Sequence, residues 1–234
     1  MKNFSKLLIV IALLLTAFYF SQIMKKVFGF SATTFISSGF LVQMFLLISS
    51  FIYLFKEQIS FSDFGFKLIK LKYLVLSVLF GSLEGITSII IMIIFVIISG
   101  TKDVTPHPAS TKGFLSTIIN VWIIASLCEE IFFRGFVYKV FSNLRQKGFH
   151  LGKKIFVSIP VTISAVLFGF GHFCLLRVMI PPMVFGIVIS ATILGFIAGI
   201  LREKSGSLIP AYLTHLMANV MGSVIPFLLK KYSL

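Results

Sequence analysis

The chain has 234 residues, of which 58% are hydrophobic and 12% are charged. About a quarter of the residues in an ordinary soluble domain are charged, so this composition excludes that class and indicates a polytopic helical membrane protein. The net charge of +14 resides mostly in short connectors, where Lys and Arg meet anionic lipid headgroups. We therefore expect a lipid bilayer and no nucleic acid among the partners of this protein.

The sequence predicts an all-α fold, a transmembrane helical bundle of about seven spans within one membrane-embedded domain over residues 1–234. No hydrophilic stretch is long enough to form a separate soluble domain. The expected spans, taken in chain order, are Leu7–Met24, Thr33–Phe55, Leu71–Ile98, Leu115–Val140, Phe156–Phe173, Val178–Leu201 and Leu208–Leu229.

The N-terminal stretch resembles a signal peptide, because Met1–Lys6 is basic and an apolar run follows. It lacks a convincing small-x-small cleavage site, so we interpret it as a retained first span. Lys and Arg are more numerous in the segments that would share a side with the N-terminus. The positive-inside rule then predicts a multi-pass protein of the cell membrane with a cytoplasmic N-terminus.

Two connectors carry local expectations. The basic segment Ser142–Lys154 is predicted to be a short amphipathic helix on the membrane surface. Pro181 and Pro182 are expected to make the start of the sixth span irregular.

Three ionisable residues stand close together inside the fourth span, namely Glu129, Glu130 and Arg134. Charge in hydrocarbon costs about 2.5–3.5 kcal/mol per residue on insertion scales, so such groups indicate function. Glu130 and Arg134 are four residues apart and are predicted to pair on one helix face. Glu129 is rotated by about 100° from Glu130 and is expected to face a cavity as a candidate general base. The alternative is that all three form one packing network.

Two further spans carry polar residues at helical spacing. His172 follows Phe168 by four residues, and the intervening Gly169 and Gly171 are expected to let a neighbouring helix approach closely. The alternative for this histidine is a bond to a backbone carbonyl.

His215 and Asn219 share a face of the last span and can donate hydrogen bonds toward a common point, as an oxyanion site requires. The alternative is ordinary interhelical hydrogen bonding. Together, the acid, imidazole and amide groups of three spans provide what water activation and carbonyl polarisation need. Glu84 is a further buried acid with flanking glycines, which indicate a close helix crossing or a bend, and the sequence gives it no role.

These motifs resemble those of the CAAX protease and bacteriocin-processing family (CPBP, or Abi). Glu129–Arg134 is similar to its EExxxR motif, Phe168–His172 to its FxxxH motif, and His215–Asn219 to its HxxxN motif. Their order and spacing agree with the family. The resemblance covers roughly Ile118–Val224, so we treat residues 118–224 as a motif-bearing CPBP-like core.

The resemblance implies an intramembrane endopeptidase that cleaves a peptide or protein substrate near the membrane. By that resemblance Glu129 and His172 activate the attacking water, and His215 and Asn219 stabilise the oxyanion. The positions that would support the site are Glu130, Arg134 and Phe168. Leader peptides, bacteriocins and signalling-peptide precursors are the plausible substrates.

Two questions stay open at this point. A zinc ion held by Glu129, His172 and His215 is one reading, but the chain has no HExxH motif, and we favour a glutamate mechanism without a metal. The alternatives to an enzyme are a non-catalytic membrane scaffold or bacteriocin-immunity factor and, less favoured, a proton-coupled transporter.

Overall fold

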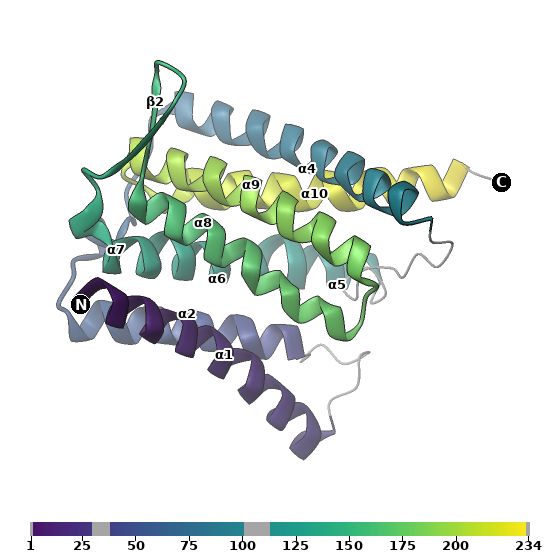
Figure 1. Ribbon diagram of the computed structural model, residues 1–234, viewed down its shortest axis with the longest axis horizontal. Coiled ribbons are helices and arrows are strands. Elements are labelled where there is room, and N and C mark those ends of the chain that lie inside the picture. The colour runs from purple at the N-terminus through teal and green to yellow at the C-terminus, as the bar shows by residue number, and fades with distance from the viewer. Residues whose placement is uncertain (1, 30–37, 101–112, 233–234) are drawn as a thin grey trace.

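The computed structural model describes residues 2–29, 38–100 and 113–232, and these are almost entirely helical (Figure 1). Within those ranges, six helical segments are long and apolar enough to cross a membrane: Asn3–Phe28, Ser38–Lys56, Leu71–Ser99, Phe114–Val140, Ile159–Arg177 and Pro181–Ser205. The prediction of a polytopic helical bundle is confirmed. The seventh expected span coincides with α10 (Leu208–Tyr232), which is not among those six. The expected start of the second span, Thr33, lies outside the described residues.

The first half of the chain forms helices α1 (Lys2–Phe28), α2 (Ser38–Lys56) and α4 (Leu71–Ser99), with the short α3 (Phe61–Phe64) between the last two. The fourth span is one long, irregular helix. Its parts are α5 (Phe114–Thr117), the π-helical η2 (Ile118–Ala125), α6 (Ser126–Glu130), the π-helical η3 (Ile131–Val137) and α7 (Tyr138–Val140). This irregular helix is called the central helix below.

The second half begins with the single turn η4 (Ser142–Leu144) and a hairpin of β1 (Gly148–Leu151) and β2 (Ile155–Ser158). Helix α8 (Ile159–Gly171) follows and tightens into the 3₁₀ segment η5 (His172–Arg177). Helix α9 (Pro181–Ser205) and α10 complete the chain.

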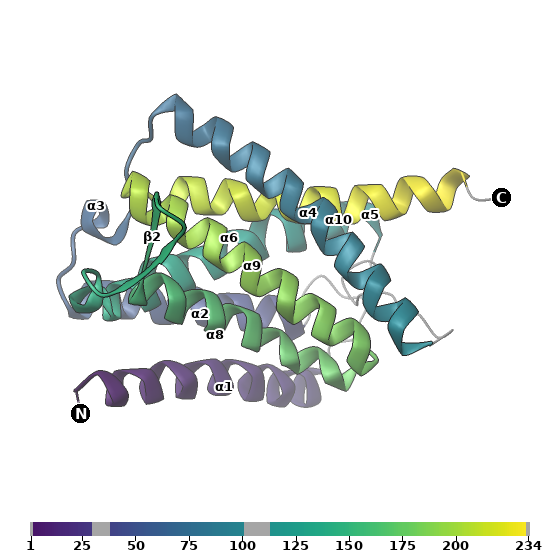
Figure 2. The ribbon, with the colours of Figure 1, turned by 45° about the horizontal axis from the view of Figure 1, so that its top comes forward.

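The central helix lies in the middle of the bundle. It packs against α2 on one side and against α8 and α10 on the other. Helix α1 covers α2, and α4 packs on α9 and α10, so that α1 and α4 lie on opposite sides of the molecule (Figure 2). Helices α2 and α10 contact α6, the part of the central helix that carries Glu129 and Glu130.

Glycines bring α4 and α10 into close contact. Gly81 and Gly85 form a G-x-x-x-G face, the spacing that lets membrane helices approach closely. A Cβ atom at Gly85 would lie 2.6 Å from the Ala218 carbonyl oxygen. The close crossing indicated by the glycines around Glu84 is confirmed.

Glycines also bring α8 and α9 into close contact. Of the two glycines expected to allow such an approach, only one does so. A Cβ atom at Gly195 would lie 2.8 Å from the Ala165 Cα atom, and one at Gly169 would overlap Thr192. No atom lies within 4 Å of the Cβ position at Gly171. The expectation of close helix approach is confirmed for Gly169 and wrong for Gly171.

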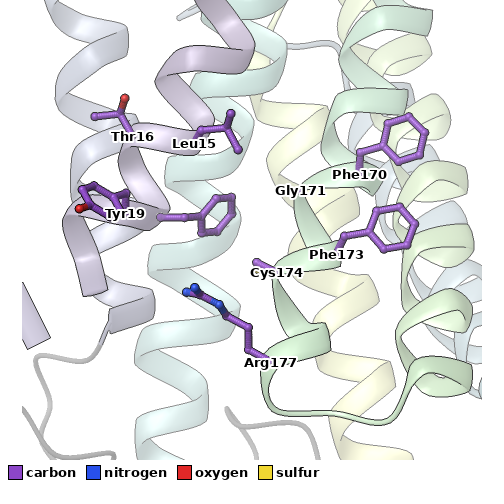
Figure 3. Close-up of a pocket in the computed structure, with 9 residues that line it drawn as sticks. Leu15, Thr16, Tyr19, Phe170, Gly171, Phe173, Cys174 and Arg177 are labelled. Atoms are coloured by element: carbon purple, nitrogen blue, oxygen red, sulfur yellow. The ribbon is translucent and has the colours of Figure 1, made fainter. Parts of the chain in front are cut away.

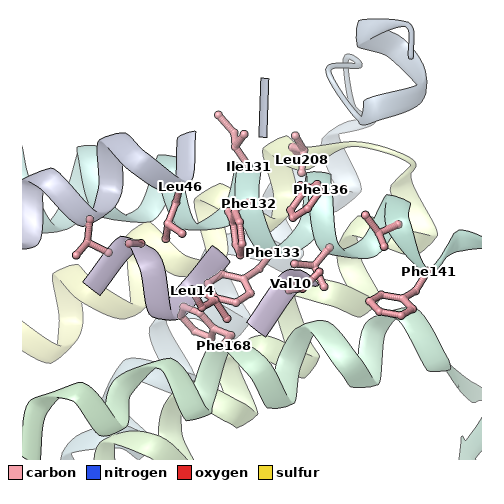
Figure 4. Close-up of a cluster of buried hydrophobic side chains, with 14 of the residues drawn as sticks. Val10, Leu14, Leu46, Ile131, Phe132, Phe133, Phe136, Phe141, Phe168 and Leu208 are labelled. Carbon is pink, nitrogen blue, oxygen red and sulfur yellow. The ribbon is translucent and has the colours of Figure 1, made fainter. Parts of the chain in front are cut away.

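A phenylalanine-rich core surrounds the second half of the central helix (Figure 4). Side chains from α1, α2, α8 and α10 meet there, among them Leu14, Leu46, Phe168 and Leu208. Burying large apolar side chains stabilises each by roughly 1.5–3 kcal/mol in water, whereas within lipid the gain comes from close packing. This core fixes the rotation of the central helix and thus where its carboxylates point.

Two local expectations were wrong. The segment Ser142–Lys154 forms a turn and a β-hairpin, because aromatic and branched residues favour strands and Gly152 supplies the positive φ of +63° at the reversal. The prolines do not disrupt the sixth span, since Pro181 is the first residue of α9, where its missing N–H is harmless.

Candidate active site

The two glutamates lie on α6, a single α-helical stretch between two π-helical ones. π-helical turns are rare and occur frequently at functional sites, because the extra residue per turn changes which side chains share a face. Nothing in the sequence pattern signalled them. They place Glu129 and Glu130 near the middle of the fourth span, toward different neighbours.

Glu130 is the buried partner of Arg134 and His215. Its Oε1 atom accepts a hydrogen bond from Arg134 Nη1 at 2.9 Å and lies 2.9 Å from His215 Nδ1. The predicted pairing of Glu130 with Arg134 is present, and both side chains are buried. Because an ionised carboxylate only accepts, Nδ1 of His215 carries the hydrogen in this contact. Glu130 thereby holds the imidazole with its Nε2 atom directed elsewhere.

That Nε2 atom faces Glu129. It lies 3.8 Å from Glu129 Oε2, while Glu129 Oε1 accepts a hydrogen bond from Gln43 Nε2 of α2 at 2.5 Å. The Glu129 side chain is 16% exposed and that of Glu130 only 1%. Glu129 is thus the carboxylate that a water molecule or a substrate can reach.

The Phe168 ring links the two histidines. Its centroid lies 5.1 Å from that of the His172 ring and 5.3 Å from that of the His215 ring, both nearly edge to face. The Arg134 guanidinium carbon lies 4.6 Å from the same centroid, within cation–π range. Phe168 therefore forms a common wall for His172, His215 and Arg134.

His172 stands where α8 gives way to η5. Its Nδ1 atom lies 2.9 Å from the Phe168 carbonyl oxygen. A carbonyl only accepts, so Nδ1 carries the hydrogen, and the lone pair of the neutral ring is on Nε2. The backbone-carbonyl contact is the alternative that the sequence left open, and it fixes the tautomer that a general base needs.

Asn219 is not turned toward the same point as His215. Its Nδ2 atom donates to Ser126 Oγ at 2.9 Å and to the Val121 carbonyl at 3.3 Å. Ser126 in turn donates to Val121. Asn219 thus lies beside the π-helical η2, one helical turn from His215. This arrangement matches the alternative of ordinary interhelical hydrogen bonding.

Sequence reasoning missed Gln43 and Ser126. Both are polar residues in apolar spans, and that signal alone was enough to single them out. Glu84, by contrast, was noticed without a role. It is 5% exposed on α4, the helix that packs on α10, which carries His215.

The donor groups of the polar cluster are not arranged as a metal site. Across the described parts of the chain, no three His, Cys, Asp or Glu side chains are grouped so that they could hold one. Glu129, His172 and His215 therefore do not form a ready-made zinc site in this arrangement.

A cavity of about 650 Å³ lies beside His172, between α1 and η5 (Figure 3). Gly171 and Phe173, the two neighbours of His172, line it opposite Leu15 and Tyr19. Cys174 also lines it. The lining is mostly apolar, and this volume lies in the range of small-ligand pockets. The cavity thus borders the residues on either side of His172.

Comparison with known proteins gives one match. The family model described as type II CAAX prenyl endopeptidase Rce1-like matches residues 111–221, a stretch that contains all three motifs. No curated protein and no solved structure matches the chain.

Proposed function

Residues 111–221 belong to the type II CAAX prenyl endopeptidase Rce1-like family, which is the CPBP family, and from this premise we propose that the chain is an intramembrane endopeptidase that uses Glu129 as its base. The supporting observation is the division between the two glutamates. His215 contacts both, Arg134 pairs with Glu130, and only Glu129 is accessible.

In the proposed reaction, Glu129 accepts one proton of a water molecule while the free Nε2 of His172 accepts a hydrogen bond from the other hydrogen, and the water oxygen attacks the scissile carbonyl carbon. The carbonyl π electrons move onto its oxygen. When this oxyanion collapses, the C–N bond breaks and the proton passes to the leaving nitrogen. The products are a carboxylic acid and an amine, so that one water is consumed for each bond.

In this proposal the protonated ring of His215 stabilises the oxyanion through Nε2–H, and the bond of Nδ1 to Glu130 supports this role. Asn219 contributes a second donor once its amide exchanges Ser126 for the substrate oxygen. Glu130, Arg134 and Phe168 hold the two imidazoles in place.

The proposed mechanism needs no metal. Incubation with a chelator is expected to leave the cleavage rate unchanged, because the proposed base is a carboxylate and no step passes through a bound ion. Loss of cleavage on prolonged chelation, restored by added zinc, would contradict this part of the proposal and leave Glu129 as a ligand instead.

The substrate class follows from the approach to the site. The cavity beside His172 is apolar and lies between membrane-crossing helices, so the proposed substrate is an apolar peptide segment in or at the membrane. A prenylated protein is not required by this lining; bacteriocin leaders and signalling-peptide precursors fit it equally.

The decisive experiment compares the peptides that accumulate in membranes containing wild-type protein, Glu129→Ala, or the control Glu57→Ala. Glu57 is an exposed glutamate at the end of α2, outside the polar cluster. We expect products from the wild type and the control and none from Glu129→Ala, with all three inserted equally. Full activity of Glu129→Ala would refute the proposal, and cellular complementation by Glu129→Gln would favour the scaffold alternative.

A further inference from the structure

A second cavity, of about 220 Å³, lies at the end of the bundle where α3, α7 and the last turn of α9 meet. Four cationic residues line it, namely Lys67, Lys139, Arg145 and Arg202, together with the acidic Asp63 and Glu203. The lining therefore carries an excess of two positive charges, four minus two. It lies in a part of the molecule that the proposed proteolysis does not use.

The charges within this cavity are unequally paired. Arg145 Nε donates to Glu203 Oε1 at 3.0 Å, so these two neutralise each other. Among the described residues, neither the Lys67 nor the Lys139 ammonium group has a hydrogen-bonding or ionic partner. The cationic surplus is thus available to an incoming anion.

Arg202 is the buried member of the set. It is 5% exposed, its Nη2 atom donates to the Phe64 carbonyl at 2.9 Å, and its guanidinium lies 5.3 Å from the Tyr138 ring centroid. Its Nε–H has no partner in the described parts of the chain, and no ion pair there includes this residue. A buried guanidinium without a direct ion-pair partner is costly, and it is suited to binding a phosphate.

The place of the cavity identifies the phosphate. Two membrane-crossing segments, Phe114–Val140 and Pro181–Ser205, end at its rim, and α3 lies between two others. Figure 2 shows α3 at the same end of the molecule as the N-terminus. The cavity is therefore at the level of the lipid headgroups. Its volume is below that of ordinary small-molecule sites, so it admits a single headgroup phosphate.

We propose that this cavity binds the phosphate of an anionic phospholipid. Basic pockets between membrane helices are known to take such headgroups, and each surface Lys or Arg contributes about 1 kcal/mol to the attraction. Lys67 and Lys139 attract the anion, and Arg202 holds it. The bound lipid then joins α3 to the ends of α7 and α9.

The test uses the purified full chain in detergent and follows its thermal unfolding midpoint and its retention of lipid by native mass spectrometry. Phosphatidylglycerol is titrated against phosphatidylcholine, and inorganic phosphate is tested separately. We expect phosphatidylglycerol to raise the midpoint in a concentration-dependent manner, because only the folded state binds it. Phosphatidylcholine and inorganic phosphate should have little effect. An equal shift with inorganic phosphate would overturn the assignment to a lipid.

Two double variants separate the cavity from general surface charge. Lys67→Gln/Lys139→Gln removes two charges from the cavity, and Lys153→Gln/Lys154→Gln removes two from the hairpin turn. We expect the first to weaken phosphatidylglycerol binding on the order of 10- to 30-fold and the second to leave it nearly unchanged. Equal losses in both would refute a specific site.

A variant that is expected to bind more tightly keeps the test valid if the Lys67→Gln/Lys139→Gln variant fails to fold. Asp63→Asn removes one of the two acids that line the cavity. It is expected to tighten phosphatidylglycerol binding about 5-fold, by relieving repulsion of about 1 kcal/mol. Unchanged or weaker binding by this variant would contradict the proposal.

Discussion

Glu129 and Glu130 are neighbours in the chain, yet their environments differ in every respect that matters for chemistry. Glu130 is buried and bonded to Arg134 and His215. Glu129 is partly exposed and held by one neutral amide donor, Gln43. Successive residues of a helix point about 100° apart, so one short segment presents one buried, ion-paired carboxylate and one partly exposed carboxylate.

Matched amide substitutions should separate these two roles. Glu129→Gln is expected to lower the cleavage rate by about 10²–10⁴-fold, the usual contribution of a general base, while the thermal unfolding midpoint stays near that of the wild type. Glu130→Gln should instead lower the midpoint, since it leaves Arg134 buried without a counter-charge. Kinetics and thermal unfolding in detergent check both. A stable, fully active Glu130→Gln variant would contradict the assignment.

The buried ion pair makes a sharper prediction. Arg134→Met removes the guanidinium partner of Glu130 and leaves it only the His215 imidazole, and breaking a buried ion pair costs about 3–5 kcal/mol. The double variant Glu130→Gln/Arg134→Met removes both charges and is expected to recover much of that loss, although not the activity. A double-mutant cycle of unfolding free energies measures the coupling. Additive effects would show that the pair contributes nothing of its own.

Gln43 is the residue whose role the motifs did not reveal. Gln43→Leu keeps the volume but removes the hydrogen bond to Glu129. We expect the cleavage rate to fall at saturating substrate with little change in KM, because Gln43 positions the base and does not touch the cavity lining given for the substrate. Gln43→Asn, with a shorter amide, should be intermediate. A change in KM alone would indicate substrate contact instead.

At the scale of helices, the spans and the motif spacing were predictable because composition and periodicity are local properties. The i, i+4 pairing of Glu130 with Arg134 followed in the same way. Three features could not be predicted in this way: the π-helical turns around α6, the change to a 3₁₀ helix at His172, and the hydrogen bonds of Asn219. These depend on which helices surround the central one, and that information is spread over α2, α8 and α10 and is not encoded in any single segment.

The contact of α4 with α10 tests how firmly His215 is placed. In Gly85→Ala the new methyl group would meet the Ala218 carbonyl at 2.6 Å, so α10 must shift. Such overpacking costs about 1–3 kcal/mol, and we expect loss of both thermal stability and activity. Gly222→Ala is the control, since no atom lies within 4 Å of its Cβ position. Equal behaviour of the two variants would contradict a positioning role for this contact.

At the scale of the whole molecule, α3, the hairpin and most of the second cavity lie at the end of the bundle where the N-terminus lies, which is called the amino-terminal end here. The sequence predicted which side of the membrane this end faces only through its excess of Lys and Arg. The hairpin itself was mistaken for a surface helix, because its basic composition suits either structure and only the paired strands distinguish them.

Cysteine labelling tests this orientation. In a variant without Cys128 and Cys174, a single cysteine at Gln58 or at Lys153 lies at the amino-terminal end of the bundle, and one at Arg177 lies at the end of the span that follows the hairpin. With a cytoplasmic N-terminus, the first two are expected to resist a membrane-impermeant maleimide in intact cells, and the third to react. The reverse pattern would invert the topology.

The hydrogen bond from Gln43 to Glu129 extends the polar cluster beyond residues 111–221, the stretch that the family model matches. Residues 111–221 hold every motif, whereas Gln43 and Glu84 come from the first hundred residues of the chain. Two homologues with identical motifs can therefore differ in how strongly their carboxylate attracts a proton, if their amino-terminal helices differ. Chimeras that exchange only those helices would transfer reactivity without altering a single motif position.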